Sequence, residues 1–327
     1  RPEDIGLERP EHTVHNLVVE AGELQQEFVR DLARRADAIR GAGEAKRPDG
    51  AGDDSMLLVC NDGRAAALDP LLVGINERSP KIAEVARDLA RVWRENADNL
   101  YGNSEVPGAF HLVLLDLGTP HPGDTAVYGR LRQLLVMHGV PADKVRWIHE
   151  AKTDKARAAL FAQCREGGVA ILMGSTSKVG VGTNIQTRLK SLWHIDAPWT
   201  PAEVEQREGR ALRPNNLNSH VDIYRCVTEG TFDAYTWQAL ERKARSFAAL
   251  YDINSVAREV DDISGTALSY GEVKALAAGN PMLLEQAKTA AVVQRLRLMR
   301  SVHLQNVNRA KQQSKQETAS AQTSTAT

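Results

Sequence analysis

Short apolar runs alternate with longer amphipathic segments through the middle of this chain, and this alternation restricts the fold more than any other feature. The run 169–173 (Val-Ala-Ile-Leu-Met) contains no polar residue, which is typical of a strand buried on both faces of a parallel sheet. Further strands are predicted at 110–117, 144–149, 191–195 and 221–227, and helices at 125–138, 153–165 and 231–251. Strands that alternate with helices of about 10–15 residues favour a parallel sheet covered by helices on both faces. The predicted fold class is therefore α/β.

The segment before residue 107 is predicted to mix regular elements with a linker. Gly, Asp and other charged residues dominate 41–54, and that composition is typical of a flexible connection. Apolar residues at steps of three and four predict a helix over 80–97. The other elements predicted here are a strand at 13–19, an amphipathic helix at 23–40 and a short apolar strand at 55–60.

Composition and charge restrict the partners more than the fold. The 327 residues suit two domains, or one domain with appendages, and the net charge of −1 means that any DNA contact depends on local basic patches. The cysteines Cys60, Cys164 and Cys226 lie far apart without CxxC or zinc spacing, which favours a reducing, cytoplasmic location. The nine histidines show no metal-ligand spacing, and no run of about 18 apolar residues occurs. We therefore expect no resident metal and no membrane contact.

The stretch 174–215 follows the buried run and carries most of the residues that suggest chemistry. Gly180, Gly182 and Asn184 fall in a predicted loop, where glycine lets a phosphate or a neighbouring element approach the backbone closely. Thr200 and Pro201 predict the start of a helix, with threonine as the N-cap and proline at the first helical position.

That helix is predicted to carry Gln206, Arg207, Arg210 and Arg213. Arg210 and Arg213 are three residues apart, so both are expected on one face of the helix. Two guanidinium groups on one face suit the phosphates of a nucleotide, because Arg binds phosphate in a bidentate way and stays charged. A solvated basic helix face is the competing interpretation of the same residues.

Short motifs occur in a recognisable order between residues 110 and 213. The strand 110–117 is followed by Gly118-Thr119-Pro120, and Ser175-Thr176 is followed by Gly180-Val-Gly-Thr-Asn184. Asp196-Ala-Pro-Trp199-Thr-Pro201 then precedes Gln206-Arg-Glu-Gly-Arg-Ala-Leu-Arg213. In this order they resemble motifs IV, V and VI of superfamily 2 helicases and translocases, most closely the Swi/Snf-type branch. The stretch also resembles the helicase part of large bacterial, phage and plasmid N-6 adenine methylase-helicase proteins.

The resemblance implies a RecA-like fold and one half of an ATP site. In superfamily 2 motors ATP lies between two RecA-like lobes, and the first lobe supplies the phosphate loop and the Mg²⁺ ligands. The sequence contains no Gly-x-x-x-x-Gly-Lys-Ser/Thr loop and no Asp-Glu-x-His. We therefore expect the second lobe only, with ATP shared with a missing first lobe, Mg²⁺ bound by that lobe, and no ATP hydrolysis by this chain alone. Because the chain begins with Arg1, we expect a fragment of a longer polypeptide.

The resemblance also implies roles for individual residues. The expected catalytic residues are Arg210 and Arg213 as arginine fingers, with Gln206 beside them. Residues expected to line the nucleotide are Gly180, Gly182 and Asn184. Residues expected to contact the DNA backbone, independently of base sequence, are Gly118, Thr119, Ser175, Thr176 and Lys178.

The predicted domain order is a lobe-connecting segment at 1–106, a RecA-like helicase C-terminal lobe at 107–251, a brace segment at 252–279, and a long basic helix with a disordered tail at 280–327. From residue 280 onwards seven Lys and Arg stand against two Glu, which suits either a DNA-backbone arm or a solvated helix face.

Two alternative functions come from other classes. Asp196-Ala-Pro-Trp199 superficially matches the motif with which N-6 adenine methyltransferases grip an adenine, although no cofactor loop precedes it. The chain could also be a stand-alone DNA- or protein-binding module without ATPase activity. Within the motor interpretation, strand separation and translocation along duplex DNA both stay open.

Overall fold

The computed structural model describes residues 9–42, 46–47, 50, 52–121, 126–179 and 184–251, together with separate positions between 289 and 303. The chain divides into two units, 1–268 and 269–327. The described positions of the second unit are helical, as predicted for this part of the chain. The predicted brace segment at 252–279 and the tail lie outside the described residues.

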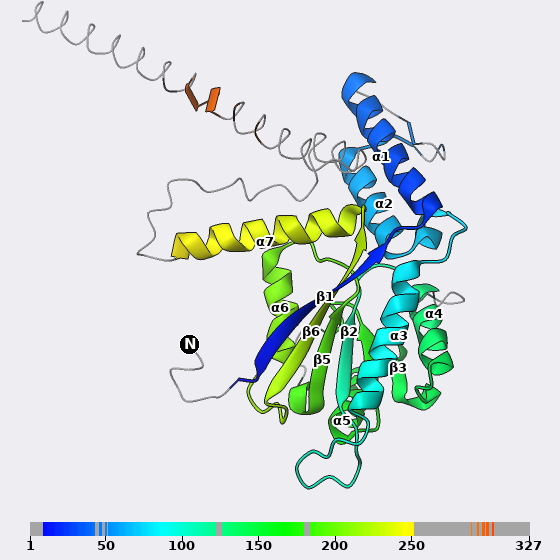
Figure 1. Ribbon diagram of the computed structural model, residues 1–327, viewed down its shortest axis with the longest axis vertical. Coiled ribbons are helices and arrows are strands. Elements are labelled where there is room, and N and C mark those ends of the chain that lie inside the picture. Colours follow the sequence, from blue (N-terminus) through cyan, green and yellow to red (C-terminus); the bar gives the residue numbers. More distant parts are fainter. Residues whose placement is uncertain are drawn as a thin grey trace, which may run out of the picture. The chain divides into compact units, whose positions relative to one another are not determined.

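A six-stranded sheet forms the centre of the first unit (Figure 1). Its spatial order is β1-β6-β5-β2-β4-β3, and every neighbouring pair is parallel. The strands are β1 (Glu11–Glu20), β2 (Phe110–Leu114), β3 (Val145–Trp147), β4 (Ile171–Gly174), β5 (Leu189–His194) and β6 (His220–Glu229). The predicted strands at 13–19, 110–117, 169–173, 191–195 and 221–227 are confirmed with shifted ends, whereas 144–149 divides into β3 and the 3₁₀ helix η4 (Ile148–Glu150).

Helices cover both faces of the sheet. Successive strand residues point to opposite sides, so a strand with apolar residues at every position packs against helices on both faces. Val113 packs with α3 (Pro80–Glu95) and α4 (Ala126–Met137) in one apolar core. The preceding residue, Leu112, packs with α5 (Asp154–Glu166) and with Ala211 of α6 (Pro201–Ala211) in another. The predicted class, a RecA-like parallel sheet with helices on both faces, is confirmed. Shorter 3₁₀ segments are η2 (Pro70–Val73), η3 (Ala142–Lys144) and η5 (Gln186–Arg188).

The residues predicted as a strand at 55–60 instead begin helix α2 (Met56–Leu68), so that prediction is wrong. Ser55 caps the helix, and its hydroxyl accepts a hydrogen bond from the backbone N–H of Leu58. Buried residues continue from Val59 to Leu68, so the five apolar residues at the start are only the beginning of a longer helix. A short apolar run does not by itself distinguish a strand from a buried helix.

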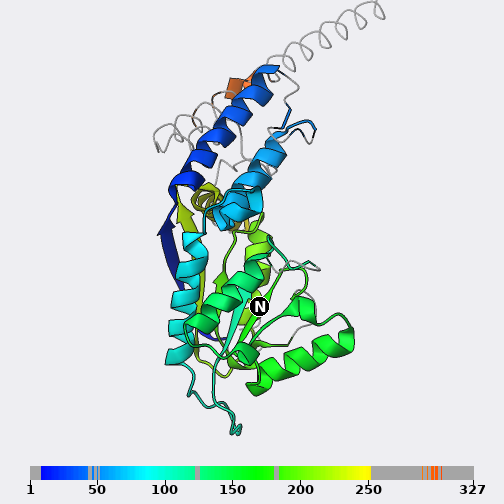
Figure 2. The same ribbon diagram turned by 90° about the vertical axis from the view of Figure 1, so that its right-hand side faces the viewer.

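Helix α2 lies beside α1 (Glu23–Ala42) in both views (Figure 1, Figure 2). Arg35 of α1 joins the two through ion pairs of 2.7 Å to Asp54 and to Asp62. On its other side α2 approaches α7 (Phe232–Tyr251) closely, and a Cβ atom at Gly63 would lie 2.6 Å from the Phe232 ring.

The segment 1–106 contributes directly to the central sheet and its core. Strand β1 pairs with β6 over its full length, from Glu11 opposite His220 to Glu20 opposite Glu229. Helix α3 belongs to the same core as β2 and β4. The boundary predicted at residue 106 stays a prediction, but the residues before it build part of the lobe.

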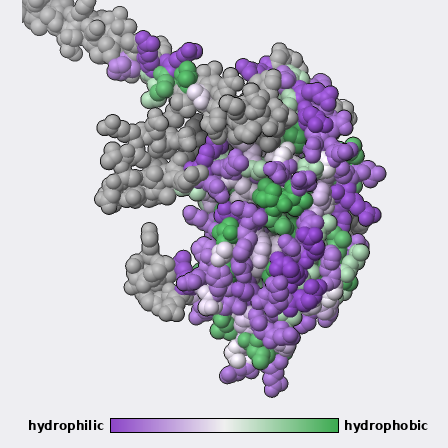
Figure 3. All heavy atoms as spheres, in the orientation of Figure 1, coloured by the Kyte–Doolittle hydropathy of each residue, from purple (hydrophilic) through white to green (hydrophobic). Residues whose placement is uncertain are grey.

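Hydrophilic side chains cover most of the face shown in Figure 3, and apolar side chains form small separate groups there. Within the described ranges no helix is both long and apolar enough to cross a membrane.

Candidate functional site

Polar residues gather where three neighbouring strands end. Asp116 follows β2, Thr176 follows β4 and Asp196 follows β5, and these strands are adjacent in the order β5-β2-β4. The carboxyl ends of parallel strands lie at the same edge of the sheet, and in open α/β folds this edge is where ligands bind.

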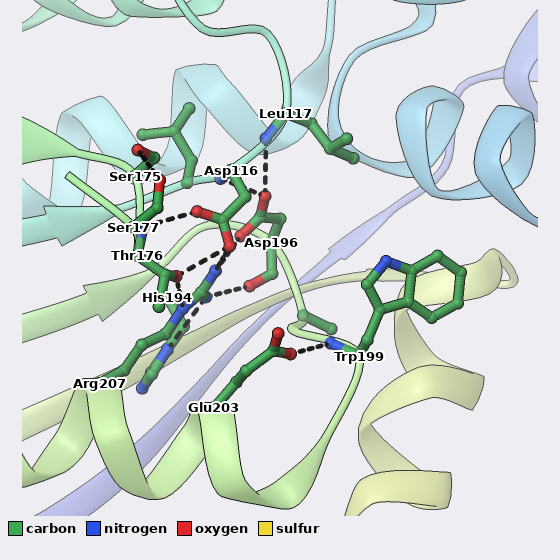
Figure 4. A network of polar contacts seen from close by, with 12 residues as sticks. Asp116, Leu117, Ser175, Thr176, Ser177, His194, Asp196, Trp199, Glu203 and Arg207 are labelled. Carbon is green, nitrogen blue, oxygen red and sulfur yellow. Dashed lines mark hydrogen bonds and ion pairs between the residues drawn. The ribbon is translucent and has the colours of Figure 1, made fainter. Parts of the chain in front are cut away.

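Arg207 of α6 holds these three strand ends together (Figure 4). Its side chain is fully buried, and its guanidinium donates Nε–H to Thr176 Oγ1 at 2.7 Å. Nη2 binds Asp116 Oδ2 at 2.7 Å and Asp196 Oδ1 at 3.0 Å, and Nη1 donates to the Asp196 carbonyl at 2.9 Å. One planar fork therefore contacts the ends of β2, β4 and β5.

The two carboxylates are held by further donors. Asp196 Oδ2 accepts from the backbone N–H groups of Asp116 and Leu117 at 2.6 and 3.0 Å. Asp116 accepts from the N–H and the hydroxyl of Thr176 at 2.6 and 2.8 Å. The Thr176 hydroxyl thus donates to Asp116 and accepts from Arg207, and both of its hydrogen bonds are internal.

The charges in this network stabilise one another. Burial would raise the pKa of Asp116, but the charge of Arg207 and the hydrogen bonds from Thr176 lower that pKa below its usual value. Burial would likewise lower the pKa of Arg207, but the carboxylates of Asp196 and Asp116 raise it above its usual value. Asp116 and Arg207 therefore both stay ionised at neutral pH.

The start of α6 is fixed by the predicted cap. The Thr200 hydroxyl accepts from the Glu203 N–H at 3.3 Å, and Glu203 Oε2 accepts from the N–H groups of Trp199 and Thr200 at 2.9 and 3.1 Å. This is a capping box with Pro201 in the first turn, so the N-cap prediction is confirmed.

Of the predicted catalytic residues, Gln206 lies in the middle of α6, Arg210 lies in its last turn, and Arg213 lies beyond its end. Gln206 is exposed, and Arg210 in the last turn is 5% exposed. The helix ends at Ala211, so Arg213 lies beyond it, and the prediction that one helical face carries both arginines is wrong. Burial lowers the pKa of Arg210, and the positive charge of Arg213 lowers it further.

Of the residues expected to line the nucleotide, only Asn184 is described. It is exposed, and its carbonyl accepts a hydrogen bond from Arg165 at 2.9 Å. Gly180 and Gly182 lie outside the described residues, so their roles stay predictions.

The residues expected to contact the DNA backbone differ in how far they are buried. Gly118 has φ +61°, and a Cβ there would lie 2.6 Å from Val127 Cγ2, so the backbone itself requires glycine. Ser175 is buried, with its hydroxyl 3.2 Å from that of Ser177, and Thr119 is half-buried. Lys178 is exposed. Lys178 is therefore the expected DNA contact that the fold leaves most accessible.

Sequence reasoning assigned no role to Arg207 or Asp116 in this site. Both carried a local signal: Asp116 follows a buried strand directly, and Arg207 lies in the Gln-Arg-x-Gly-Arg pattern. Their pairing was not readable, because 91 residues separate them in sequence.

Both carboxylate oxygens of Asp196 belong to the Arg207 network. This residue is 2% exposed, and both of its carboxylate oxygens accept internal hydrogen bonds. A carboxylate in this position is not free to bind an adenine amino group, and this disfavours the methyltransferase alternative. Among the described residues no group of three His, Cys, Asp or Glu side chains could hold a metal ion.

The fold is a RecA-like lobe, and part of its sequence is similar to a helicase C-terminal domain. Residues 127–215 match the family described as the helicase conserved C-terminal domain, and this range includes the stretch 174–213 that resembles motifs V and VI. The chain is also similar to "Defense against restriction protein B" of Escherichia phage P1, with 33% identity over 85 residues, which are 26% of this chain and 4% of that protein.

Solved structures agree on the fold. The SWI2/SNF2 ATPase core domain of Sulfolobus solfataricus superposes with a TM-score of 0.51 at 13% identity over 82% of this chain. The same core in complex with dsDNA superposes with a TM-score of 0.50 at 13% identity over 74% of this chain. This chain covers 48% and 46% of those two structures. The predicted resemblance is confirmed for the helicase C-terminal domain at 127–215 and for a fold similar to that of SWI2/SNF2 ATPase cores. The place of this chain as a second motor lobe and an upstream methylase stay predictions.

Proposed function

We propose that this chain is the second motor lobe of an ATP-dependent DNA helicase or translocase and needs a first lobe for activity. The observation that carries the proposal is the Arg207 network. It joins the loop after β4, which carries the expected DNA contacts, to helix α6, which leads to the expected arginine fingers. A change in the loop after β4 would therefore be transmitted to α6, and the reverse, through the buried guanidinium of Arg207.

Arg210 and Arg213 suit the phosphates of ATP. Each guanidinium is a planar fork that can bind phosphate oxygens in a bidentate way, and only Ala211 and Leu212 separate the two residues in sequence. ATP would supply the phosphoryl group that is transferred to water. In this chain Arg210 and Arg213 would bind its phosphate oxygens and stabilise the charge that spreads over them, with the exposed Gln206 beside them. Mg²⁺ and the phosphate loop belong to the proposed first lobe.

The DNA backbone is the proposed second ligand. Lys178 and Ser177 are exposed on the loop after β4, and Thr119 is half-buried after β2. Such contacts position a protein on phosphates without reading bases, so binding should not depend on sequence and should weaken with salt. One of the structural relatives is described as a complex with dsDNA, which supports this choice of ligand.

ATP hydrolysis with and without a first lobe tests the proposal. The purified chain should show no turnover alone and DNA-stimulated, Mg²⁺-dependent turnover when a first lobe is fused to it. Turnover by the chain alone would contradict the half-site assignment. DNA binding that persists while no first lobe restores turnover would instead favour a stand-alone binding module.

A further inference from the structure

Three buried cations bind three consecutive carbonyl groups at the end of β5. Lys81 Nζ donates to the Ile195 carbonyl at 3.0 Å, Arg207 Nη1 to the Asp196 carbonyl at 2.9 Å, and Arg64 Nη2 to the Ala197 carbonyl at 2.6 Å. The three cations come from α3, α6 and α2. The turn between β5 and α6 is thus held from three helices at once.

Arg64 differs from the other two in its charge partners. Lys81 is paired with Asp233, and Arg207 with Asp116 and Asp196. Arg64 is 7% exposed, and within the part of the chain that the structure describes it forms no ion pair. Its guanidinium lies instead 4.0 Å from the centre of the Trp199 ring, and burial lowers its pKa.

A buried cation without an ion pair is unfavourable for the free energy of folding. Burying a charge carries a large desolvation penalty, and a well-packed apolar side chain of similar length would avoid it. Packing alone therefore does not explain arginine at position 64. Both of its contacts, the Ala197 carbonyl and the Trp199 ring, lie in the turn that leads into the capping box of α6. In Figure 4 the Trp199 side chain points away from Arg207, so Arg64 and Arg207 hold different parts of this turn.

We propose that Arg64 is a positioning residue for α6. Through Ala197 and Trp199 it fixes the first turn of this helix, and through the helix it sets where Arg210 and Arg213 lie. This proposal rests on the proposed function for its catalytic consequence only. It makes helix α2, which precedes the helicase motifs in sequence, a part of the motor site.

Two substitutions at Arg64 and one matched control test the proposal. Arg64→Met keeps the length of the side chain but removes the donor and the charge, and Arg64→Lys restores a donor and a charge without the planar stack. Arg35→Met makes the same change in the neighbouring helix α1, where it removes the ion pairs to Asp54 and Asp62 but touches no residue of 195–203. The control separates a general loosening of the α1–α2 pair from an effect on α6.

Amide hydrogen exchange of the full chain is the first measurement. Arg64→Met should speed exchange at the Trp199 and Thr200 amides, which donate to Glu203, by roughly 2- to 10-fold, the equivalent of about one hydrogen bond. Arg64→Lys should recover part of this protection. Arg35→Met should speed exchange in α1 and α2 and leave residues 199–203 unchanged. Unchanged exchange at 199–203 in Arg64→Met would overturn the proposal.

Turnover in the two-lobe enzyme is the second measurement. Arg64→Met should lower kcat of DNA-stimulated ATP hydrolysis by roughly 10- to 100-fold with KM for ATP within about twofold, because a displacement of about 1 Å has that effect on chemistry. Arg35→Met should lower the thermal midpoint but not kcat. Equal kcat in wild type and Arg64→Met would overturn the catalytic part. Absence of turnover in the wild-type enzyme would overturn the proposed function, while the exchange measurement still decides whether Arg64 positions α6.

Discussion

Arg207 Nη2 lies 2.7 Å from Asp116 Oδ2, although 91 residues separate the two in sequence. The pair joins the loop after β2 to the middle of α6. Asp196 completes the arrangement at 3.0 Å from the same nitrogen. A single side chain therefore contacts the ends of β2, β4 and β5, and its removal is the most direct test of the site.

Arg207→Met should destabilise the lobe by about 3–5 kcal/mol, because it leaves Asp116 and Asp196 without their counter-charge. Urea unfolding of the purified chain measures this difference. Arg91→Met is the control, since Arg91 is half-exposed, pairs with Asp88 and Glu95 on its own helix, and should change stability by less than about 1 kcal/mol. Equal effects of the two substitutions would contradict the importance given to the network.

Arg210→Lys and Arg213→Lys should each lower ATP turnover of the two-lobe enzyme by roughly 10³–10⁵ while DNA affinity changes little. Lysine keeps the charge but lacks the planar fork that matches a phosphoryl group. Steady-state turnover and DNA binding are measured side by side, with Arg91→Lys as the control. Full activity in either variant would show that the substituted arginine is not catalytic.

Lys178→Ala should weaken DNA binding at low salt and reduce the slope of log K against log salt concentration by about 0.9, the contribution of one phosphate contact. Its exposure means that stability should not change. Thr176→Ala should behave differently and cost about 1–3 kcal/mol of stability, because its hydroxyl bridges Asp116 and Arg207. Fluorescence anisotropy over a range of salt concentrations, together with urea unfolding, separates the two effects. An unchanged salt slope in Lys178→Ala would remove Lys178 from the DNA contacts.

His111 should make the lobe less stable in acid. It is fully buried, and burial lowers its pKa to about 3, whereas the unfolded chain has the ordinary value near 6.5. Between these values only the unfolded state binds the proton, so this contribution to stability is complete above about pH 6.5 and is lost as the pH falls towards 3. His111→Gln should lower the slope of unfolding free energy by about 1.4 kcal/mol per pH unit in this range. Urea unfolding between about pH 4 and 7 measures the slope of unfolding free energy against pH in the wild type and in His111→Gln. Equal slopes in the two proteins would contradict this prediction.

Substitution of two glycines by alanine should change the stability of the lobe in opposite directions. Gly63→Ala should destabilise the lobe by about 1–3 kcal/mol, because the new methyl would meet the Phe232 ring. Gly209 lies inside α6, and a methyl group added there would have no neighbouring atom within 4 Å, so Gly209→Ala should stabilise by about 0.5–1 kcal/mol. Thermal unfolding compares the two. A loss of turnover in the more stable Gly209→Ala would indicate that a ligand or the first lobe needs this space.

The parts of the structure that depend on local signals were predictable. Thr200 and Pro201 fixed the start of α6, and the apolar runs located the strands of the sheet. The end of α6 was predicted wrongly, although the sequence carries a signal for it, because Pro214 disfavours helical backbone at the preceding Arg213. Helix α2 was not predictable, because its apolar start is as compatible with a strand as with a helix. The partners of Arg207 and the contacts of Arg64 depend on tertiary structure, which no local pattern describes.

The position of β1 has a consequence for how the chain folds. Strand β1 pairs with β6, the last strand among the described residues, so Glu11 has no partner until His220 has been synthesised. A ribosome that adds about 5–20 residues per second needs on the order of ten seconds or more to make the intervening chain. During that time β1 presents unpaired backbone groups to every other nascent chain. Contacts this distant in sequence also slow folding. The lobe should therefore fold late in synthesis, and a chain that stops before β6 should aggregate.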